Sequence, residues 1–259
     1  RTGSKYQPFP EEINRRMVSV VADLNFAPTE HSRQNLLREG VDPSTILVTG
    51  NPVIDALSSI VTRPLPPVAH QLLSRAGVQG GERSLILVTA HRRENFGQPI
   101  VNICHALRDL AAEFSQKISI IYPVHLNPNI LEPVQRLLHG IPNILLVEPL
   151  DYLPLVHLMK NALVILTDSG GIQEEATALG KPALVLRDVT ERPEGIEAGL
   201  LKLVGTDREA IVSETRRLIQ DPAAVAAMST TENPFGDGHA ASRIVQAVVE
   251  YPSRMNTPA

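Results

Sequence analysis

Residues 162–175 read ALVILTDSGGIQEE, an apolar run of strand length that ends in small and polar residues and leads directly into a helix-forming segment. Gly170 and Gly171 allow the backbone to approach an anion closely, and Ser169 supplies a hydroxyl group. The free N–H groups at the start of a helix point at negative charge. The pattern therefore predicts a strand–turn–helix unit that can hold a phosphate. An ordinary strand-to-helix turn of an α/β protein would use the same residues, so this segment alone leaves both interpretations open.

Two carboxylates follow the glycines. Glu174 and Glu175 lie about one helical turn inside the predicted helix. A carboxylate in that place can accept hydrogen bonds from two vicinal sugar hydroxyls. Together with the phosphate cradle, the pair suggests a site for the ribose and diphosphate of a nucleotide.

Three other apolar runs of strand length also end in polar residues, within segments 84–97, 117–129 and 183–195. Because open α/β sheets bind ligands at the carboxyl ends of their parallel strands, we expect these polar residues to gather at one edge. The residues are His91, Arg92, Arg93, Glu94 and Asn95 after the first run, His125 and Asn127 after the second, and Arg187, Asp188, Thr190, Glu191 and Arg192 after the third.

Strand-like runs alternate with helix-like periodic segments along the chain, which is typical of an α/β protein with a mostly parallel sheet covered on both faces. Thr206 or Asp207 can cap the helix predicted after it. The predicted strands span 45–48, 85–89, 118–122, 144–147, 163–166, 183–186 and 201–204, and the clearest predicted helices span 101–114, 129–138 and 207–219.

Composition excludes several classes of function. A net charge of -4, 3% aromatic residues and no Trp argue against a nucleic-acid-binding surface. No apolar stretch reaches the length of a membrane span. Cys104 has no second cysteine with which to form a disulfide or a thiolate metal site, and we expect it to pack in the core. The histidines match no metal-binding spacing and no GxGxxG fingerprint is present, so we expect neither a metal nor a nicotinamide cofactor.

Eight motifs, in order and spacing, resemble the non-hydrolysing UDP-N-acetylglucosamine 2-epimerase family of bacterial type. They run from one end of the chain to the other, so the resemblance is far more specific than a single glycine loop. The motifs are PFPEEINRR (8–16), TGNPVIDAL (49–57), TAHRREN (89–95), YPVHLNPN (122–129), LDYLPLVHLM (150–159), TDSGGIQEEA (167–176), LRDVTERPE (186–194) and NPFGDGHAASRI (233–244).

The resemblance implies two Rossmann-like domains in the GT-B arrangement, facing each other across a cleft. RTGSKY at the start of the chain corresponds to the middle of the family's chain, so we expect most of the amino-terminal domain to be missing from this sequence. Residues 1–50 are then the remainder of that domain, residues 51–243 form the UDP-binding carboxyl-terminal domain, and residues 244–259 cross back to the first domain. A family Asp and a family Glu assigned to catalysis fall in the missing part and match no residue here.

The implied reaction is the interconversion of UDP-N-acetylglucosamine and UDP-N-acetylmannosamine, through elimination of UDP to 2-acetamidoglucal and its re-addition. Glu11 matches the family's acid/base Glu, and His91 matches its active-site His. We expect the adjacent carboxylates of Glu11 and Glu12 to raise one pKa into a useful range. Without the resemblance, both would simply be favourable acidic residues at a helix start.

The resemblance also assigns the binding residues. Ser169, Gly170 and Gly171 would receive the diphosphate, Glu175 rather than Glu174 would bind the ribose, and Arg92 and Arg192 would contact phosphate or sugar. A salt bridge with Glu191 or Glu194 is the structural alternative for Arg192. His125 and Asn127 would belong to a second, allosteric site, since some bacterial members are activated by a further substrate molecule. Leu155 stands where many members place an aromatic residue against uracil, which removes stacking geometry.

We expect UDP-N-acetylglucosamine and UDP as ligands, no nucleic-acid or membrane partner, no cofactor, a homodimer of the full-length protein and a cytoplasmic location. Two alternatives remain: a GT-B glycosyltransferase, against which Glu11, Glu12 and AHRREN argue, and a catalytically incomplete module that binds a UDP-sugar. The isolated chain should be nearly inactive. The product would enter a pathway of cell-surface polysaccharide biosynthesis that the sequence does not identify.

Overall fold

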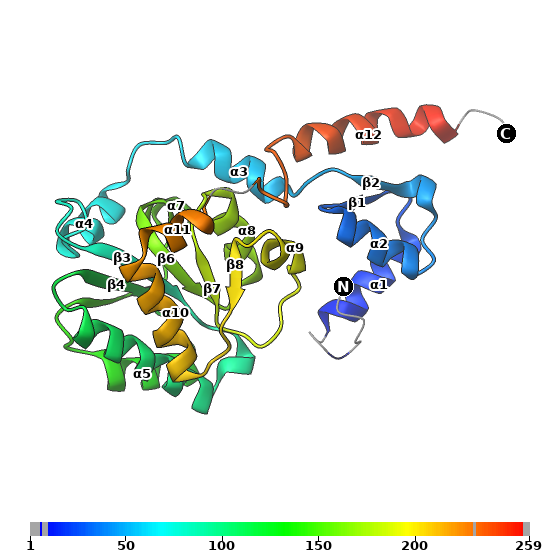
Figure 1. Cartoon of the computed structure of the whole chain (residues 1–259). Helices are drawn as coiled ribbons and strands as arrows, with labels where there is room; N and C mark the ends of the chain where they lie inside the picture. Colours follow the sequence, from blue (N-terminus) through cyan, green and yellow to red (C-terminus); the bar gives the residue numbers. More distant parts are fainter. Residues whose placement is uncertain (1–5, 7–9, 230–231, 256–259) are drawn as a thin grey trace. The chain divides into compact units, whose positions relative to one another are not determined.

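The structure is a computed structural model that describes Tyr6, residues 10–229 and residues 232–255, with side chains described as far as Tyr251 (Figure 1). The chain divides into two compact units. Unit 1 comprises Arg1–Ser59 and Asn233–Ala259, and unit 2 comprises Ile60–Glu232.

Unit 2 is built on a six-stranded sheet in which every neighbouring pair is parallel, in the order β5-β4-β3-β6-β7-β8. The strands are β3 (Ser84–Thr89), β4 (Ile118–Pro123), β5 (Ile144–Val147), β6 (Ala162–Thr167), β7 (Ala183–Val185) and β8 (Leu201–Leu203). The helices are α4 (Pro67–Arg75), α5 (Gln98–Glu113), α6 (Pro128–Leu138), α7 (Tyr152–Asn161), α8 (Gly170–Ala178), α9 (Pro193–Glu197), α10 (Arg208–Gln220) and α11 (Pro222–Ala227), with a 3₁₀ turn η2 (Arg93–Asn95).

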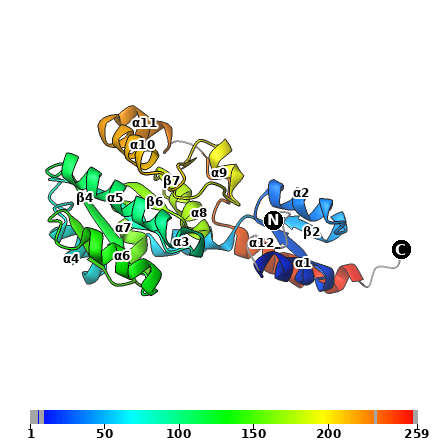
Figure 2. The same ribbon diagram turned by 90° about the horizontal axis from the view of Figure 1, so that it is seen from below.

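Helices cover both faces of this sheet (Figure 2). The sequence of β3 shows why: Ile86 and Val88 pack with α5, α6, α10 and α11, whereas Leu85 and Leu87 pack with α4, α7 and α8. Successive side chains of a strand point to opposite faces, so a strand buried on both faces must be apolar without interruption. The predicted α/β class with parallel Rossmann-like sheets is therefore confirmed.

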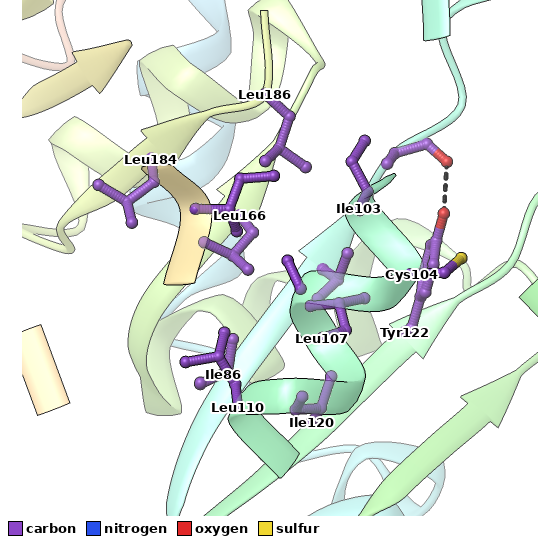
Figure 3. Packing of buried hydrophobic residues seen from close by; sticks show 14 of the residues in the cluster. Ile86, Ile103, Cys104, Leu107, Leu110, Ile120, Tyr122, Leu166, Leu184 and Leu186 are labelled. Atoms are coloured by element: carbon purple, nitrogen blue, oxygen red, sulfur yellow. Dashed lines mark hydrogen bonds between the residues drawn. The ribbon is translucent and has the colours of Figure 1, made fainter. Parts of the chain in front are cut away.

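Each face of the sheet carries a hydrophobic core. Figure 3 shows the first core, which contains Ile86 and lies between β3, β4 and α5. The hydroxyl of Tyr122 is fully buried and donates to the carbonyl oxygen of Ala90 at 2.8 Å, which ties β4 to the loop that follows β3. Cys104 lies in the same core, and burial raises the pKa of its thiol to about 12. The predicted packing role of Cys104 agrees with this position.

Unit 1 contains a two-stranded parallel sheet of β1 (Asn25–Ala27) and β2 (Ile46–Val48). Its helices are α1 (Glu11–Val21), α2 (Glu30–Arg38), α3 (Pro52–Ile60) and α12 (Ala240–Met255), with a 3₁₀ turn η1 (Pro43–Thr45). Among the described residues, no helix is both long and apolar enough to cross a membrane.

Within unit 1, α3 is bound to the start of α12. The carboxylate of Asp55 accepts from the backbone N–H groups of Ala240 and Ala241 at 3.1 and 2.9 Å, and so caps α12. Gly50, with φ +85°, lies so close to Gly236 that a Cβ on it would stand 3.3 Å from the Cα of Gly236. Residues 51–59 and 233–243 therefore cluster with unit 1.

Each of the seven predicted strands exists, with ends that shift by one residue at most. The three predicted helices exist as α5, α6 and α10, and Asp207 caps α10 by accepting from the N–H of Ala210 at 2.9 Å. Strand β1 was missed. It has only three residues, Asn25–Ala27, and no apolar run marks it.

Candidate functional site

The strand order of unit 2 reverses between β3 and β6. From β3 the sheet continues outward through β4 and β5 on one side, and through β6, β7 and β8 on the other. The loops that follow β3 and β6 therefore leave the sheet at its switch point, which is the place where open α/β sheets bind ligands. The residues predicted after these two strands, His91 and Ser169, lie at this switch point.

Asp168 joins the two loops. It is fully buried, and its Oδ2 accepts from the backbone N–H of His91 at 2.8 Å, the backbone N–H of Arg92 at 2.7 Å and the side-chain amide of Asn95 at 2.9 Å. Thr89 and Thr167 make a second link below it, with their hydroxyl oxygens 2.7 Å apart. In the sequence, Asp168 is one residue of the motif TDSGGIQEEA, and its neighbours there predict no such role.

His91 projects from this loop beside a second predicted residue. Its ring stacks on that of His125, with centroids 5.7 Å apart and an angle of 17° between the planes. Its Nδ1 lies 3.8 Å from Oδ1 of Asp168, and 43% of its side chain is exposed. The residue predicted to be catalytic and the residue predicted to be allosteric are thus direct neighbours.

Helix α8 begins at Gly170, with Ser169 in the N-cap position. The Ser169 side chain makes no capping hydrogen bond, while its backbone N–H donates to the hydroxyl of Thr167 at 3.0 Å. A Cβ built on Gly171 would meet nothing within 4 Å. The first turn of α8 therefore lacks a side-chain cap from Ser169 and has open space beside Gly171, and the N–H groups of a helix start favour an anion.

Arg192 supplies a cation at the same helix start. A Cβ on Gly170 would stand 3.2 Å from Nη2 of Arg192. The Nε of Arg192 donates to Oε1 of Glu174 at 2.5 Å. The predicted salt bridge with Glu191 is present only as a weak contact at 4.0 Å. Burial raises the pKa of the Glu174 carboxyl, against the lowering effect of Arg192.

Glu175, predicted to bind ribose, is held by a tyrosine. Tyr152, the first residue of α7, donates its hydroxyl to Oε1 of Glu175 at 2.8 Å. Burial raises the pKa of Glu175, and the hydrogen bond from Tyr152 lowers it in part. Leu155 lies one turn further along α7. It packs against the hydrophobic core on the other face of the sheet, which contains Leu87 and Leu158.

An ion network connects the β3 and β7 loops. The guanidinium of Arg187, with 5% of the side chain exposed, donates to Glu94 and to Glu191, the latter at 2.8 Å. Burial opposes ionisation of Glu191, but the hydrogen bonds and charge of Arg187 outweigh it and lower the pKa of Glu191 to about 2. The sequence placed these residues at strand ends but gave no sign of which carboxylates would pair with the arginine.

Glu11 lies in unit 1 as the first residue of α1 and is exposed, while residues 8 and 9 of its motif lie outside the described part of the chain. Glu12 is fully buried and paired with Arg15 at 3.1 Å. The predicted coupling of the two carboxylates is not supported by this geometry, because side chains at i and i+1 of a helix do not face each other.

His125 and Asn127 serve local structure at the start of α6. The N–H of Asn127 donates to Nδ1 of His125 at 3.0 Å, and Asn127 caps the helix by accepting from the N–H of Asn129 at 3.0 Å. Arg92 contributes its backbone N–H to Asp168. Within the described ranges, no three His, Cys, Asp or Glu side chains lie close enough to hold a metal ion.

The parallel sheet, its switch point and the helix start at Gly170 define a Rossmann-like α/β fold, and solved structures of GT-B type match it along almost the whole chain. A family model described as UDP-N-acetylglucosamine 2-epimerase matches residues 1–249. The chain belongs to this family.

Known members are similar along almost the whole chain. The UDP-N-acetylglucosamine 2-epimerase of Escherichia coli K12 is 52% identical over 250 residues, which are 96% of this chain and 66% of that protein. The Neisseria meningitidis UDP-GlcNAc 2-epimerase, solved with UDP-GlcNAc, is 45% identical with a TM-score of 0.89 over 96% of this chain and 67% of its own. The S. aureus protein MnaA, solved with UDP, is 43% identical with a TM-score of 0.91 over 100% of this chain and 69% of its own. The chain thus spans about two thirds of the length of these relatives.

Proposed function

We propose that this chain is the UDP-binding part of a UDP-N-acetylglucosamine 2-epimerase, which interconverts UDP-N-acetylglucosamine and UDP-N-acetylmannosamine. The observation that carries the proposal is the switch-point cluster: Asp168 joins the loop of His91 to the helix start at Ser169, where an anion can bind. The relatives solved with UDP-GlcNAc and with UDP support the choice of ligand.

In this proposal the diphosphate binds at the start of α8. Ser169, Gly170 and Gly171 offer a hydroxyl and backbone N–H groups, and Arg192 and Arg92 add positive charge. The ribose hydroxyls donate to Glu175, whose carboxylate Tyr152 holds in place. Leu155 gives the base an apolar neighbour without aromatic stacking.

The reaction breaks the C1–O bond to UDP and removes the C2 proton, which gives 2-acetamidoglucal. UDP then adds back to C1, and a proton is delivered to C2 from the opposite face. The C2 proton is weakly acidic, so stabilising the leaving diphosphate is as important as the base. Glu11 and His91 are the proposed acid/base groups, and residues of the longer relatives that this chain does not match supply the others.

Further expectations belong to the same proposal. Residues 1–50 and 244–259 would complete the amino-terminal domain and residues 51–243 would form the UDP-binding domain. The full-length protein would be a cytoplasmic homodimer with no nucleic-acid partner and no cofactor, and its product would feed cell-surface polysaccharide synthesis. His125 and Asn127 would contact a second substrate molecule. The 259-residue chain alone would turn over very slowly.

The test is incubation of the full-length parent protein with UDP-N-acetylglucosamine in deuterated water, followed by NMR. An epimerase places deuterium at C2 while UDP-N-acetylmannosamine appears, and His91→Gln should slow both signals together. Release of free N-acetylmannosamine with UDP would indicate a hydrolysing enzyme. Unexchanged substrate would contradict the proposal and favour a glycosyltransferase or a binding module.

A further inference from the structure

Asp168 has one carboxylate oxygen that the link between the two loops does not use. Oδ2 takes all three N–H donors from the β3 loop, whereas Oδ1 is buried and has no hydrogen-bond partner among the described residues. A buried carboxylate oxygen without a donor costs free energy, so its neighbourhood should offer one. Nδ1 of His91 lies 3.8 Å from this oxygen.

The surroundings of His91 favour that bond. The stacked ring of His125 limits how the imidazole of His91 can turn, and the backbone N–H of His91 is itself fixed to Asp168. A shift of about 1 Å brings Nδ1 within hydrogen-bonding distance of Oδ1. The side chain of His125 differs, because its Nδ1 already accepts from the N–H of Asn127.

We propose that Asp168 is a positioning residue for His91: Oδ2 fixes the loop, and Oδ1 accepts a hydrogen bond from Nδ1–H, so that Nε2 faces the ligand with its lone pair free. The two stacked histidines then hold opposite neutral tautomers, with the proton on Nδ1 in His91 and on Nε2 in His125. The catalytic consequence rests on the proposed function, whereas the tautomers do not.

Asp168→Asn separates the two roles of the carboxylate. The amide oxygen must replace Oδ2, since an NH₂ group there would face three N–H donors. The NH₂ group then replaces Oδ1 and donates to Nδ1 of His91, which moves the ring proton to Nε2. The loop keeps its anchor while the tautomer is reversed.

The matched control is Asn95→Ala. It removes one of the three donors to Oδ2 and leaves Oδ1 unchanged. A loss that comes only from loosening the loop would therefore occur in this variant too, but the tautomer of His91 would not change.

The first measurement is a long-range ¹H–¹⁵N correlation spectrum of the histidines in the 259-residue chain at about pH 8, where an ordinary imidazole is neutral. The His91 signals are assigned by their loss in His91→Gln. We expect the Nδ1–H tautomer in the wild type and in Asn95→Ala, and the Nε2–H tautomer in Asp168→Asn. An Nε2–H tautomer of His91 in the wild type overturns the proposal. A tautomer of His91 that is the same in the wild type and in Asp168→Asn also overturns it.

The second measurement is turnover by the full-length protein. Asp168→Asn should lower kcat about 100-fold and change KM less than about threefold, since a wrong tautomer affects the reaction and not binding. Asn95→Ala should lower kcat less than about tenfold. Equal kcat losses in the two variants would overturn the positioning role. Expected tautomers in a full-length protein that exchanges no C2 hydrogen would instead refute the proposed function and leave the pairing of Asp168 and His91 intact.

Discussion

The guanidinium of Arg192 lies over Gly170, where a methyl group would stand 3.2 Å from Nη2, and its Nε is bound to Glu174 at 2.5 Å. A carboxylate of α8 thus holds a cation beside the amino terminus of the same helix. A diphosphate bound there would meet backbone donors and a guanidinium already close to it, so little side-chain ordering would be needed on binding.

The open space beside Gly171 predicts a variant that separates binding from stability. Gly171→Ala should be neutral or stabilising by about 0.5–1 kcal/mol, because alanine favours a helix and its Cβ meets nothing within 4 Å. It should weaken UDP binding about tenfold, since the methyl group occupies the proposed diphosphate space. Calorimetric titration and urea unfolding measure the two effects. Gly170→Ala is the comparison variant, because its methyl group would meet the guanidinium of Arg192. If Gly171→Ala binds UDP with unchanged affinity, the phosphate binds elsewhere.

Removing Arg192 should leave Glu174 as a buried charge without its cation. Arg192→Ala is expected to lower the free energy of unfolding at pH 7.5 by about 1–2 kcal/mol, as the side chains of the pair are 28% and 8% exposed. Adding Glu174→Gln should recover most of the loss, because the amide needs no counter-ion. A double variant as unstable as Arg192→Ala would show that the arginine acts through packing and not through charge.

Tyr152→Phe should make stability more dependent on pH. Burial raises the pKa of Glu175 above the ordinary 4.5, so the folded state binds more protons than the unfolded state, and stability falls as pH rises above about 4.5. Loss of the tyrosine hydroxyl raises that pKa further. Urea unfolding should therefore show a larger loss at pH 7.5 than at pH 5. Tyr251→Phe, in α12, is the control and should show a loss that is the same at both pH values.

Glu191→Gln tests the ion network, and its effect on stability should depend on pH in the opposite direction to that of Tyr152→Phe. The pKa of Glu191 is lowered to about 2, so its contribution is complete above the ordinary value of 4.5 and disappears as pH falls toward 2. We expect a loss of about 2 kcal/mol at pH 7 that becomes smaller between pH 4.5 and pH 3. Glu214→Gln, which removes a surface partner of Lys202, should cost less than about 1 kcal/mol. A loss for Glu191→Gln that stays constant down to pH 3 would contradict the assignment.

Local patterns predicted the sheet because buried parallel strands have an unambiguous signature. Ile144–Val147 was predicted to the residue, and the polar residues after the strands of unit 2 do lie at strand ends. The partners across the site were not predictable in this way. Asp168 receives its donors from residues 73 to 77 positions earlier, and nothing in the letters TDSGG distinguishes such an anchor from a turn residue.

The charged residues show the same limit. Proximity in sequence predicts Glu191 or Glu194 as the partner of Arg192. The short contact of Arg192 is with Glu174, which lies 18 positions away. Glu11 and Glu12 were expected to act as a pair, but one is exposed and the other is buried against Arg15. The pairing of Arg192 depends on a tertiary contact between the loop before α9 and helix α8, and the fates of Glu11 and Glu12 depend on which face of α1 the fold buries.

The three hydrogen bonds to Asp168 also affect how the site forms. They join segments 73 to 77 residues apart, so they appear only after β3 and β6 have become neighbours, and closing so long a loop is slow compared with forming a helix. A nascent chain that has folded only β3, β4 and β5 holds His91 but lacks the start of α8, where the anion is proposed to bind. UDP would therefore bind late in folding. It would stabilise the complete sheet, but not the β3–β5 side or the β6–β8 side by itself.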